Sequence, residues 1–270
     1  MGNSSKVNRL NDLSAQEWMK FTKTWFIHNP VPRKKNEVLH PAKYPEKLIE
    51  EFVSYFTKKG EIVLDPFVGT GSTLLACIDA KRKGIGLELQ EKYVIITEER
   101  LRDSKKGQEQ VVLCANSAQL SKIWKKNSYP SVDFIITSPP YGPMLRKKGL
   151  ISKSREESGL DTHYSENIDD LGNAKSYDEF LSRLVNVFIQ SKDILKKNHY
   201  LVVILQNYMD KEGYKMLAWD FAREMSKYFE FRGEKIWCQD NKTLYPYGYR
   251  YSFVPNIHHH YCLIFRNSKI

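Results

Sequence analysis

Asp65-Pro66-Phe67-Val68-Gly69-Thr70-Gly71-Ser72-Thr73 (DPFVGTGST) is the stretch that decides the fold of this chain. It follows a short apolar run at residues 61–64 and precedes a second apolar run at residues 74–78. The first run has the length of a buried strand, the glycines permit a tight turn, and the second run continues as a helix. A strand, a glycine turn and a helix in this order predict the start of an α/β sheet that binds a ligand at its carboxyl edge.

Further apolar runs repeat this alternation along the chain. Four of them have the length and composition of buried strands, at residues 84–88, 110–114, 132–136 and 200–205. Because helical stretches separate the strands, we predict an α/β fold with a doubly wound, mostly parallel sheet. An antiparallel pair at residues 235–237 and 261–265 is predicted to close it.

Two long helices are predicted in the second half of the chain. The first begins at Ser176, where Ser176 and Glu179 form a capping-box pattern, and its apolar face extends to Leu195. The second covers residues 213–229.

The glycine turn predicts a cofactor site with a ribose. Backbone amides at Gly69-Thr70-Gly71 are expected to point outward at the start of a helix, where they bind a carboxylate or a phosphate. Leu74 stands where a dinucleotide-binding turn has its third glycine, and the Gly-Lys-Ser/Thr of a nucleoside triphosphate loop is missing. Glu88 follows Gly69 by 19 residues at the end of the next strand, where a carboxylate accepts hydrogen bonds from both ribose hydroxyls.

A second motif, Thr137-Ser138-Pro139-Pro140-Tyr141 (TSPPY), follows the strand predicted at residues 132–136. The two prolines restrict their own φ angles and hold the preceding residue extended, so the Ser138 hydroxyl and nearby carbonyls form a preorganised set of acceptors. Tyr141 adds a flat ring. This arrangement suits methylation of an aromatic amine, because its N–H bonds must be oriented before its nitrogen can attack.

Composition narrows the class of protein. The chain has 270 residues with 42 Lys and Arg against 32 Asp and Glu, and this excess of positive charge indicates a polyanionic partner such as nucleic acid. No apolar run is long enough to span a bilayer and no secretory signal is visible, so we expect a cytoplasmic protein without membrane contacts.

The histidine run His258-His259-His260 lacks an accompanying set of Cys, Asp or Glu. We therefore expect these side chains to pack in the fold and not to form a metal site.

The two motifs make the chain resemble the amino-methylating DNA methyltransferases that use S-adenosylmethionine. DPFVGTGST is similar to motif I of that family, TSPPY to motif IV, and residues 25–46 to motif X. The resemblance implies a class I methyltransferase (Rossmann-like) fold with S-adenosylmethionine as the cofactor. The cofactor-binding residues that it implies are His40, Pro41, Ala42, Asp65, Phe67, Gly69, Thr70, Gly71, Ser72, Thr73, Glu88, Asn116, Ser117 and Thr137.

The resemblance also implies a catalytic set and a substrate. The catalytic residues would be Ser138, Pro139, Pro140 and Tyr141, with a flipped base stacked on Tyr141. Serine at the first place of motif IV marks cytosine N4 methylation in the family, so Ser138 favours the N4-cytosine type acting on DNA. Adenine N6 methylation, guanine N2 methylation of tRNA and a catalytically silent nucleic-acid-binding subunit remain as alternatives. A cognate restriction endonuclease or specificity partner and a microbial source are expected from the family alone.

We predict a single methyltransferase domain over residues 1–270, and we expect four parts within it. They are an N-terminal arm with motif X (1–46), the cofactor-binding half (47–141), a recognition or flap loop (142–175), and the C-terminal half of the sheet (176–270). Motif X and motif I precede motif IV here, whereas close relatives often carry the TSPPY string first. Within the last part, residues 240–257 mix aromatic and basic side chains and are a candidate DNA-contacting loop.

Overall fold

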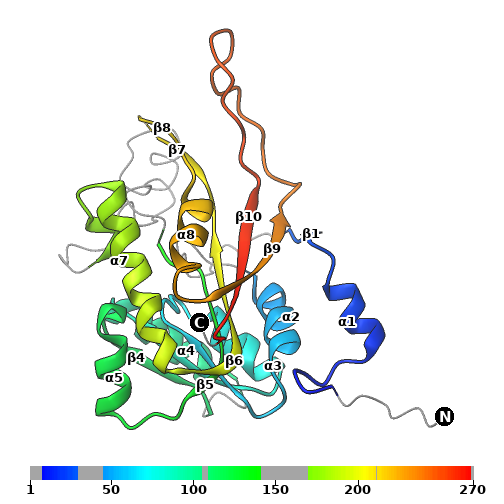
Figure 1. The fold of residues 1–270 in the computed structure, drawn as a ribbon, viewed down its shortest axis with the longest axis vertical. Coiled ribbons are helices and arrows are strands. Elements are labelled where there is room, and N and C mark those ends of the chain that lie inside the picture. Colours follow the sequence, from blue (N-terminus) through cyan, green and yellow to red (C-terminus); the bar gives the residue numbers. More distant parts are fainter. Residues whose placement is uncertain (1–7, 30–44, 105–108, 141–169, 211, 269–270) are drawn as a thin grey trace.

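A large twisted sheet organises the molecule (Figure 1). The computed structural model describes residues 8–29, 45–104, 109–140, 170–210 and 212–268. Within these ranges, eight strands pair in the order β1-β9-β10-β6-β5-β2-β3-β4. The strands are β1 (Trp25–Ile27), β2 (Ile62–Asp65), β3 (Lys83–Glu88), β4 (Val111–Cys114), β5 (Val132–Thr137), β6 (Leu195–Leu205), β9 (Glu230–Cys238) and β10 (His259–Arg266).

β10 is the antiparallel member of this sheet. It pairs antiparallel with β6 and with β9, whereas the other neighbouring strands run parallel. The prediction of a doubly wound, mostly parallel α/β sheet with an antiparallel closing strand is therefore confirmed.

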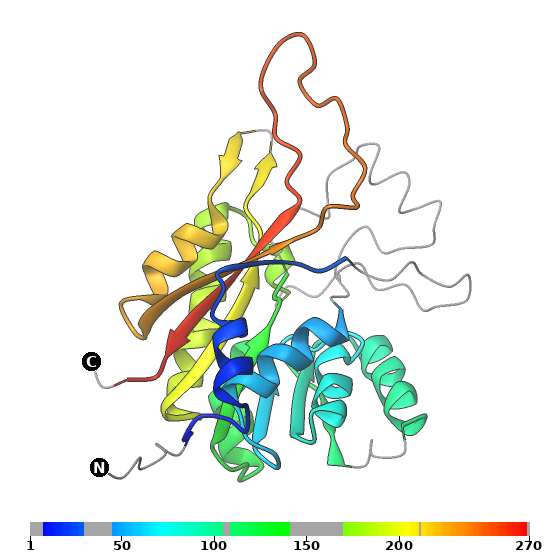
Figure 2. The same cartoon turned by 90° about the vertical axis from the view of Figure 1, so that its right-hand side faces the viewer.

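Helices cover both faces of the sheet, as a doubly wound fold requires (Figures 1 and 2). The apolar cores place α1, α2 and α3 against one face and α5, α7 and α8 against the other, while α4 packs beside α3. Their bounds are α1 (Ala15–Phe21), α2 (Glu46–Phe56), α3 (Ser72–Asp79), α4 (Glu91–Arg102), α5 (Leu120–Lys126), α7 (Tyr177–Gln190) and α8 (Leu217–Met225).

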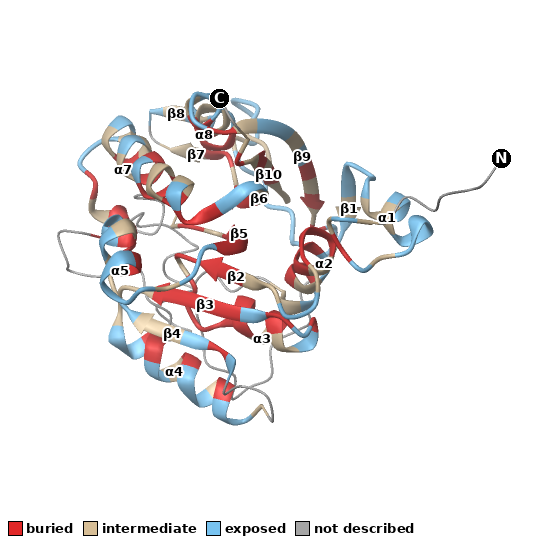
Figure 3. Ribbon diagram, turned by 60° about the horizontal axis from the view of Figure 1, so that its bottom comes forward, coloured by how far each residue is buried: buried red, intermediate tan, exposed pale blue. Residues whose placement is uncertain are grey.

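Alternation along the central strands divides the core into two layers. Val63 and Phe134 face the layer under α2 and α3, whereas their neighbours Leu64 and Ile135 face the layer under α7. Successive side chains of a strand point to opposite faces, so a strand that is covered on both sides must be apolar throughout. Figure 3 shows buried residues along most of β2 and β3, and β5 is buried throughout.

Two helix predictions were wrong in extent. Residues 213–229 do not form one helix, because β7 (Tyr208–Asp210) and β8 (Gly213–Lys215) form a hairpin and α8 begins only at Leu217. Gly213 has φ +122°, which interrupts a helix and suits a turn. The helix that begins after Ser176 ends at Gln190, and Leu195 belongs to β6.

In the part of the chain that the structure describes, every helix is too short or too polar to cross a bilayer.

Candidate active site at the carboxyl edge of the sheet

The two sequence motifs meet because the strands that precede them are neighbours. β2 pairs with β5 in parallel through Val63 with Phe134 and Leu64 with Ile135, so both strands end at the same edge of the sheet. Ligands of open α/β sheets bind outside this edge.

Asp65, at the end of β2, joins the two motifs directly. Its side chain is fully buried, and its Oδ1 accepts hydrogen bonds from the Thr137 hydroxyl at 2.5 Å and from the Phe67 N–H at 2.9 Å. Its Oδ2 accepts from the Thr73 hydroxyl. Because the carboxylate binds residues from β5, the turn and α3, it holds the turn at a set distance from the strand that leads to Ser138.

The glycine turn depends on a close approach to α4. Gly71 has φ +84°, and a Cβ atom built there would lie 2.6 Å from Cγ2 of Thr97. The Thr97 hydroxyl donates to the Gly69 carbonyl at 3.0 Å, and Arg100 donates to the Thr70 carbonyl. The turn is therefore clamped against α4, and only glycine fits at position 71.

The sequence predicts that the amides of this turn point toward a ligand, but not all of them do. The Val68 N–H donates to the Leu87 carbonyl at 3.0 Å, and the Gly71 N–H donates to the Val68 carbonyl at 2.9 Å. The Gly69 N–H donates to Oε2 of Glu88 at 3.1 Å. These bonds shape the turn, and they leave less of its backbone for anion binding than the glycine pattern implies.

Glu88, at the end of β3, is a carboxyl group in an unusual electrostatic setting. Besides the bond to Gly69, its Oε1 accepts from the Gln90 N–H at 2.9 Å. Burial raises the pKa of Glu88 to about 7, although the two backbone hydrogen bonds lower it, and the carboxylates of Asp170 and Asp65 raise it further. Burial and like charge thus oppose ionisation, and a ligand that donates to the carboxylate would favour it.

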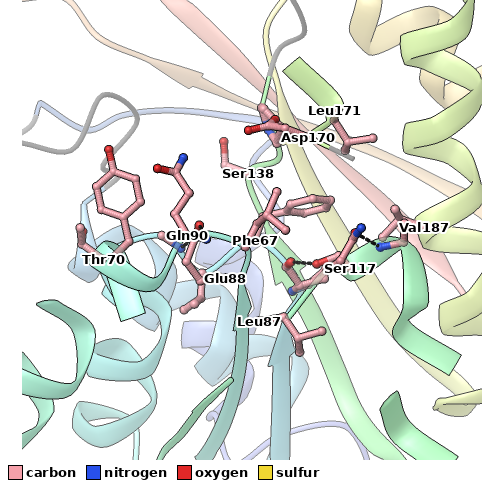
Figure 4. A pocket seen from close by; sticks show the side chains of 18 of the residues that line it. Phe67, Thr70, Leu87, Glu88, Gln90, Ser117, Ser138, Asp170, Leu171 and Val187 are labelled. Carbon is pink, nitrogen blue, oxygen red and sulfur yellow. Dashed lines mark hydrogen bonds between the residues drawn. The ribbon is translucent and has the colours of Figure 1, made fainter. Parts of the chain in front are cut away.

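A pocket of about 880 Å³, including open solvent, lies against these residues (Figure 4). The predicted site residues that line it are Phe67, Gly69, Thr70, Ser72, Glu88, Asn116, Ser117, Ser138 and Pro140. Five other predicted residues have described positions but are not among the residues that line the pocket: Asp65, Gly71, Thr73, Thr137 and Pro139. His40, Pro41, Ala42 and Tyr141 lie outside the described residues.

Asn116 and Ser117 follow β4 and shape the side of the pocket opposite the glycine turn. Asn116 Oδ1 accepts from the Ala118 N–H at 2.8 Å, and the buried Ser117 hydroxyl donates to the Pro66 carbonyl. The Ser117 bond ties the segment after β4 to the segment after β2. Both predicted residues therefore stabilise the pocket wall in this structure.

Sequence reasoning missed several pocket residues. Asp170 is buried, accepts from the Gly172 N–H at 2.9 Å, and lies near Ser138 in the pocket. Its Asp-Leu-Gly-Asn context carries a turn signal that could have separated it from the preceding polar stretch. Tyr93, Leu171 and Val187 add apolar walls, and Tyr93 could have been expected because it lies in the first turn of the helix after Glu88.

The pocket fits S-adenosylmethionine by two observations. Glu88 offers two carboxylate oxygens where a ribose is expected, and apolar side chains such as Leu87 and Phe67 stand beside it. The Ser72 hydroxyl is buried in the lining and has no hydrogen-bond partner among the described residues. Buried hydroxyls are nearly always bonded, so a polar group of the ligand is the natural partner of this one.

The histidines at residues 258–260 are not among the residues that line this pocket. The His260 ring stacks on Trp237 with centroids 4.5 Å apart, and burial lowers the pKa of His260 to about 3. Neutral packing explains such a histidine. A separate group of possible metal ligands, Glu61, Asp133 and His199, lies where β2 and β5 begin, and Asp133 already accepts from Lys196 Nζ at 2.6 Å.

The fold and the pocket together are those of the class I methyltransferases, which use S-adenosylmethionine. An rRNA methylase from Streptococcus thermophilus superimposes with a TM-score of 0.50 and 11% identity, over 84% of this chain and 98% of that one. A SAM-dependent methyltransferase from Methanosarcina mazei superimposes with a TM-score of 0.50 and 10% identity, over 80% of this chain and 96% of that one. At these identities the likeness concerns the fold alone.

The chain belongs to the DNA methylase family, whose model matches residues 3–99 and 132–270. It is similar to the type II methyltransferase M.HpaI of Haemophilus parainfluenzae, with 40% identity over 25% of this chain and 21% of that protein. It is also similar to M.BglI of Bacillus subtilis, with 36% identity over 31% of this chain and 24% of that protein. The matches thus span about a quarter of these relatives' length.

Proposed function

We propose that this protein transfers a methyl group from S-adenosylmethionine to the exocyclic N4 amine of cytosine in DNA. The observation that carries the proposal is that Ser138 and Pro140 line the same pocket as Glu88 and the glycine turn. A donor held by Glu88 and a base held by Ser138 would then lie side by side. Membership of the DNA methylase family supports DNA as the substrate, and serine at position 138 supports cytosine.

The residues of the pocket divide the work between the two substrates. When bound, S-adenosylmethionine supplies an electrophilic methyl group on sulfur. Glu88 accepts hydrogen bonds from the ribose, and the Ser138 hydroxyl and the Pro139 carbonyl accept from the amine of the base. Because these acceptors orient the N–H bonds, the nitrogen lone pair points toward the methyl group, and positioning supplies most of the rate.

The target base must leave the duplex to reach this pocket. Enzymes that modify a base extrude it and hold it between flat or apolar side chains, and Tyr141 has this role in the proposal. The excess of positive charge over the whole chain supports binding to the phosphates on either side.

The proposal treats residues 1–270 as a single methyltransferase domain that contains the arm, the cofactor-binding half and the C-terminal half of the sheet. In this view residues 142–175 form the recognition loop, of which 142–169 lie outside the described residues. A cognate endonuclease or specificity partner is part of the same proposal.

Nucleoside mass spectrometry tests the reaction. We expect DNA incubated with the protein and isotope-labelled S-adenosylmethionine to contain labelled N4-methylcytosine. Ser138→Ala should lower this rate about a hundredfold, because one oriented acceptor is lost, while calorimetry shows unchanged cofactor affinity. Ser226→Ala, at an exposed serine that follows α8 and does not line the pocket, is the matched control and should keep full activity.

Each other result assigns a different activity. Label in N6-methyladenine would show that the base is adenine, and label only in tRNA guanine would replace DNA by RNA. Cofactor binding without label in any nucleic acid would favour a catalytically silent subunit.

A further inference from the structure

The loop between β9 and β10 presents an unusual group of side chains to solvent. We call residues 244–253 the aromatic tip of this loop. Within it Tyr251 is 93% exposed, Phe253 89%, Leu244 74% and Tyr249 68%. Figures 1 and 2 both show the loop rising beyond the end of the sheet. Apolar rings that project together from a surface indicate a binding partner, because water solvates them poorly.

The aromatic tip is held in one shape by its own backbone. The Tyr251 and Ser252 N–H groups both donate to the Gly248 carbonyl at 2.9 Å. At its base, the Asn256 side chain accepts from the Tyr245 N–H and donates to the Tyr245 carbonyl, each at 2.9 Å. Such a preformed loop loses little conformational entropy when it binds.

Gly248 makes the turn of the aromatic tip possible. It has φ +68°, and a Cβ atom built there would lie 2.3 Å from the Ser252 carbonyl oxygen. A side chain at this position would collide with that carbonyl oxygen, and glycine avoids the collision. The sequence therefore specifies the shape in which the rings are displayed.

The charge of the aromatic tip points to nucleic acid. Arg250 is its only charged residue, and its guanidinium lies 5.3 Å from the Tyr249 ring centroid. Lys242 adds a second cation just before the tip. Rings beside cations suit single-stranded nucleic acid, since each base offers a flat face for stacking and each phosphate attracts a cation.

The loop also leaves the sheet at the edge that carries the candidate active site. Leu263 of β10 pairs with Val203 of β6, and Val203 pairs with Thr137 of β5, next to Ser138. Since β10 begins at His259, the loop and the Ser138 segment extend in the same direction from the sheet. DNA bound at Ser138 would have the aromatic tip on one side.

We propose that the aromatic tip is a stacking platform for unpaired bases of the DNA substrate, next to the extruded base. The inference rests on the proposed function and adds the state of the DNA that is bound. In an intact duplex each base face is covered by its neighbours, and a side chain must unstack them to insert, so exposed rings such as Tyr251 and Phe253 stack more favourably on unpaired bases. The protein should therefore prefer single-stranded over double-stranded DNA of the same sequence.

Fluorescence anisotropy with the full chain tests this preference, using labelled oligo(dT) alone and in duplex with oligo(dA). We expect the Tyr251→Ala/Phe253→Ala double variant to bind oligo(dT) at least about tenfold more weakly and to bind the duplex unchanged. Tyr228→Ala removes an exposed tyrosine at the opposite edge of the sheet and should bind as the wild type does. Cofactor binding by calorimetry verifies that each variant is folded.

Arg250→Gln separates stacking from charge. It should reduce the salt dependence of oligo(dT) binding by about one phosphate contact, whereas the double variant should keep the wild-type dependence. Equal affinity of wild type and double variant for oligo(dT) would overturn the inference. If methylated DNA bases still form in that case, the proposed function stands, whereas a wild type that neither binds nor methylates DNA overturns both. The inference would also be overturned if the double variant lost binding to phosphatidylglycerol vesicles but kept its binding to oligo(dT).

Discussion

Glu88 is the residue whose protonation should control the cofactor site. Burial raises its pKa from 4.5 to about 7, and the deprotonated form is the better acceptor for ribose hydroxyls. Binding then releases a proton, so affinity for S-adenosylmethionine should be about tenfold weaker near pH 6 than near pH 8. Calorimetry across this range measures it.

Glu88→Gln is the matched variant for this prediction. It keeps the size of the side chain and removes its ionisation, so its affinity should be weak and independent of pH. A wild-type affinity that does not change with pH would contradict the assignment of Glu88 to the ribose.

In the ligand-free protein the raised pKa of Glu88 has the opposite consequence for stability. The contribution of Glu88 to the free energy of unfolding is fully present below pH 4.5 and is lost as pH rises through about 7.

At the scale of elements, Arg82 joins the ends of two helices. Its buried guanidinium donates to the Thr57 carbonyl at 2.6 Å, to the Thr57 hydroxyl at 3.0 Å and to the Ala80 carbonyl, just past α2 and α3. Arg82→Met would leave these acceptors buried without a donor, and we expect the free energy of unfolding to fall by about 3 kcal/mol. Urea denaturation measures the change.

The neighbouring Lys83 provides the control for Arg82. Its side chain is exposed at the start of β3, so Lys83→Met should change the free energy of unfolding by less than about 0.5 kcal/mol. Similar losses in the two variants would show that the bonds of Arg82 contribute little.

At the scale of the whole molecule, the N-terminal arm covers an edge and a face of the sheet. β1 pairs with β9 through Trp25 with Ile236, and Phe21 stacks on Tyr55 with ring centroids 4.0 Å apart. The buried Lys235 ammonium donates to backbone carbonyls of the arm. Deletion of residues 1–29 should lower the free energy of unfolding by about 3 kcal/mol or more, because apolar surface is exposed.

Self-association should accompany that deletion, since β9 becomes an unpaired edge strand. Light scattering measures it, and deletion of residues 1–7, which keeps α1 and β1, is the control. A shortened chain that remains monomeric and equally stable would show that the arm is dispensable for the fold.

The fold was predictable because local patterns and global topology agree in this chain. The strands predicted at residues 61–64, 84–88 and 132–136 carry mostly apolar residues on both faces, so each run by itself predicts a buried strand. The helix predicted at residues 213–229 failed because the turn at Gly213 and the pairing of β7 with β8 override a helical pattern. Similarly, β6 starts at Leu195 because it pairs with Val132, a contact distant in sequence.

The sequence by itself determined which residues are the candidates for binding and catalysis. Gly71 is the glycine that a turn with a positive φ requires. Ser138 is followed by the rigid Pro139-Pro140 pair, and Glu88 stands at the end of an apolar strand. These are local properties, and they predict the kind of site before any fold is known.

Only the tertiary structure decided what surrounds those residues. Asp65 bonds Thr137 and Thr73, and Asp170 lies in the pocket, because strands far apart in sequence end at one edge of the sheet. The raised pKa of Glu88 has the same origin, since burial and neighbouring carboxylates arise from packing. Sequence specifies each chemical group and its local backbone, whereas distance, burial and electrostatic setting follow from long-range contacts that no short stretch of sequence encodes.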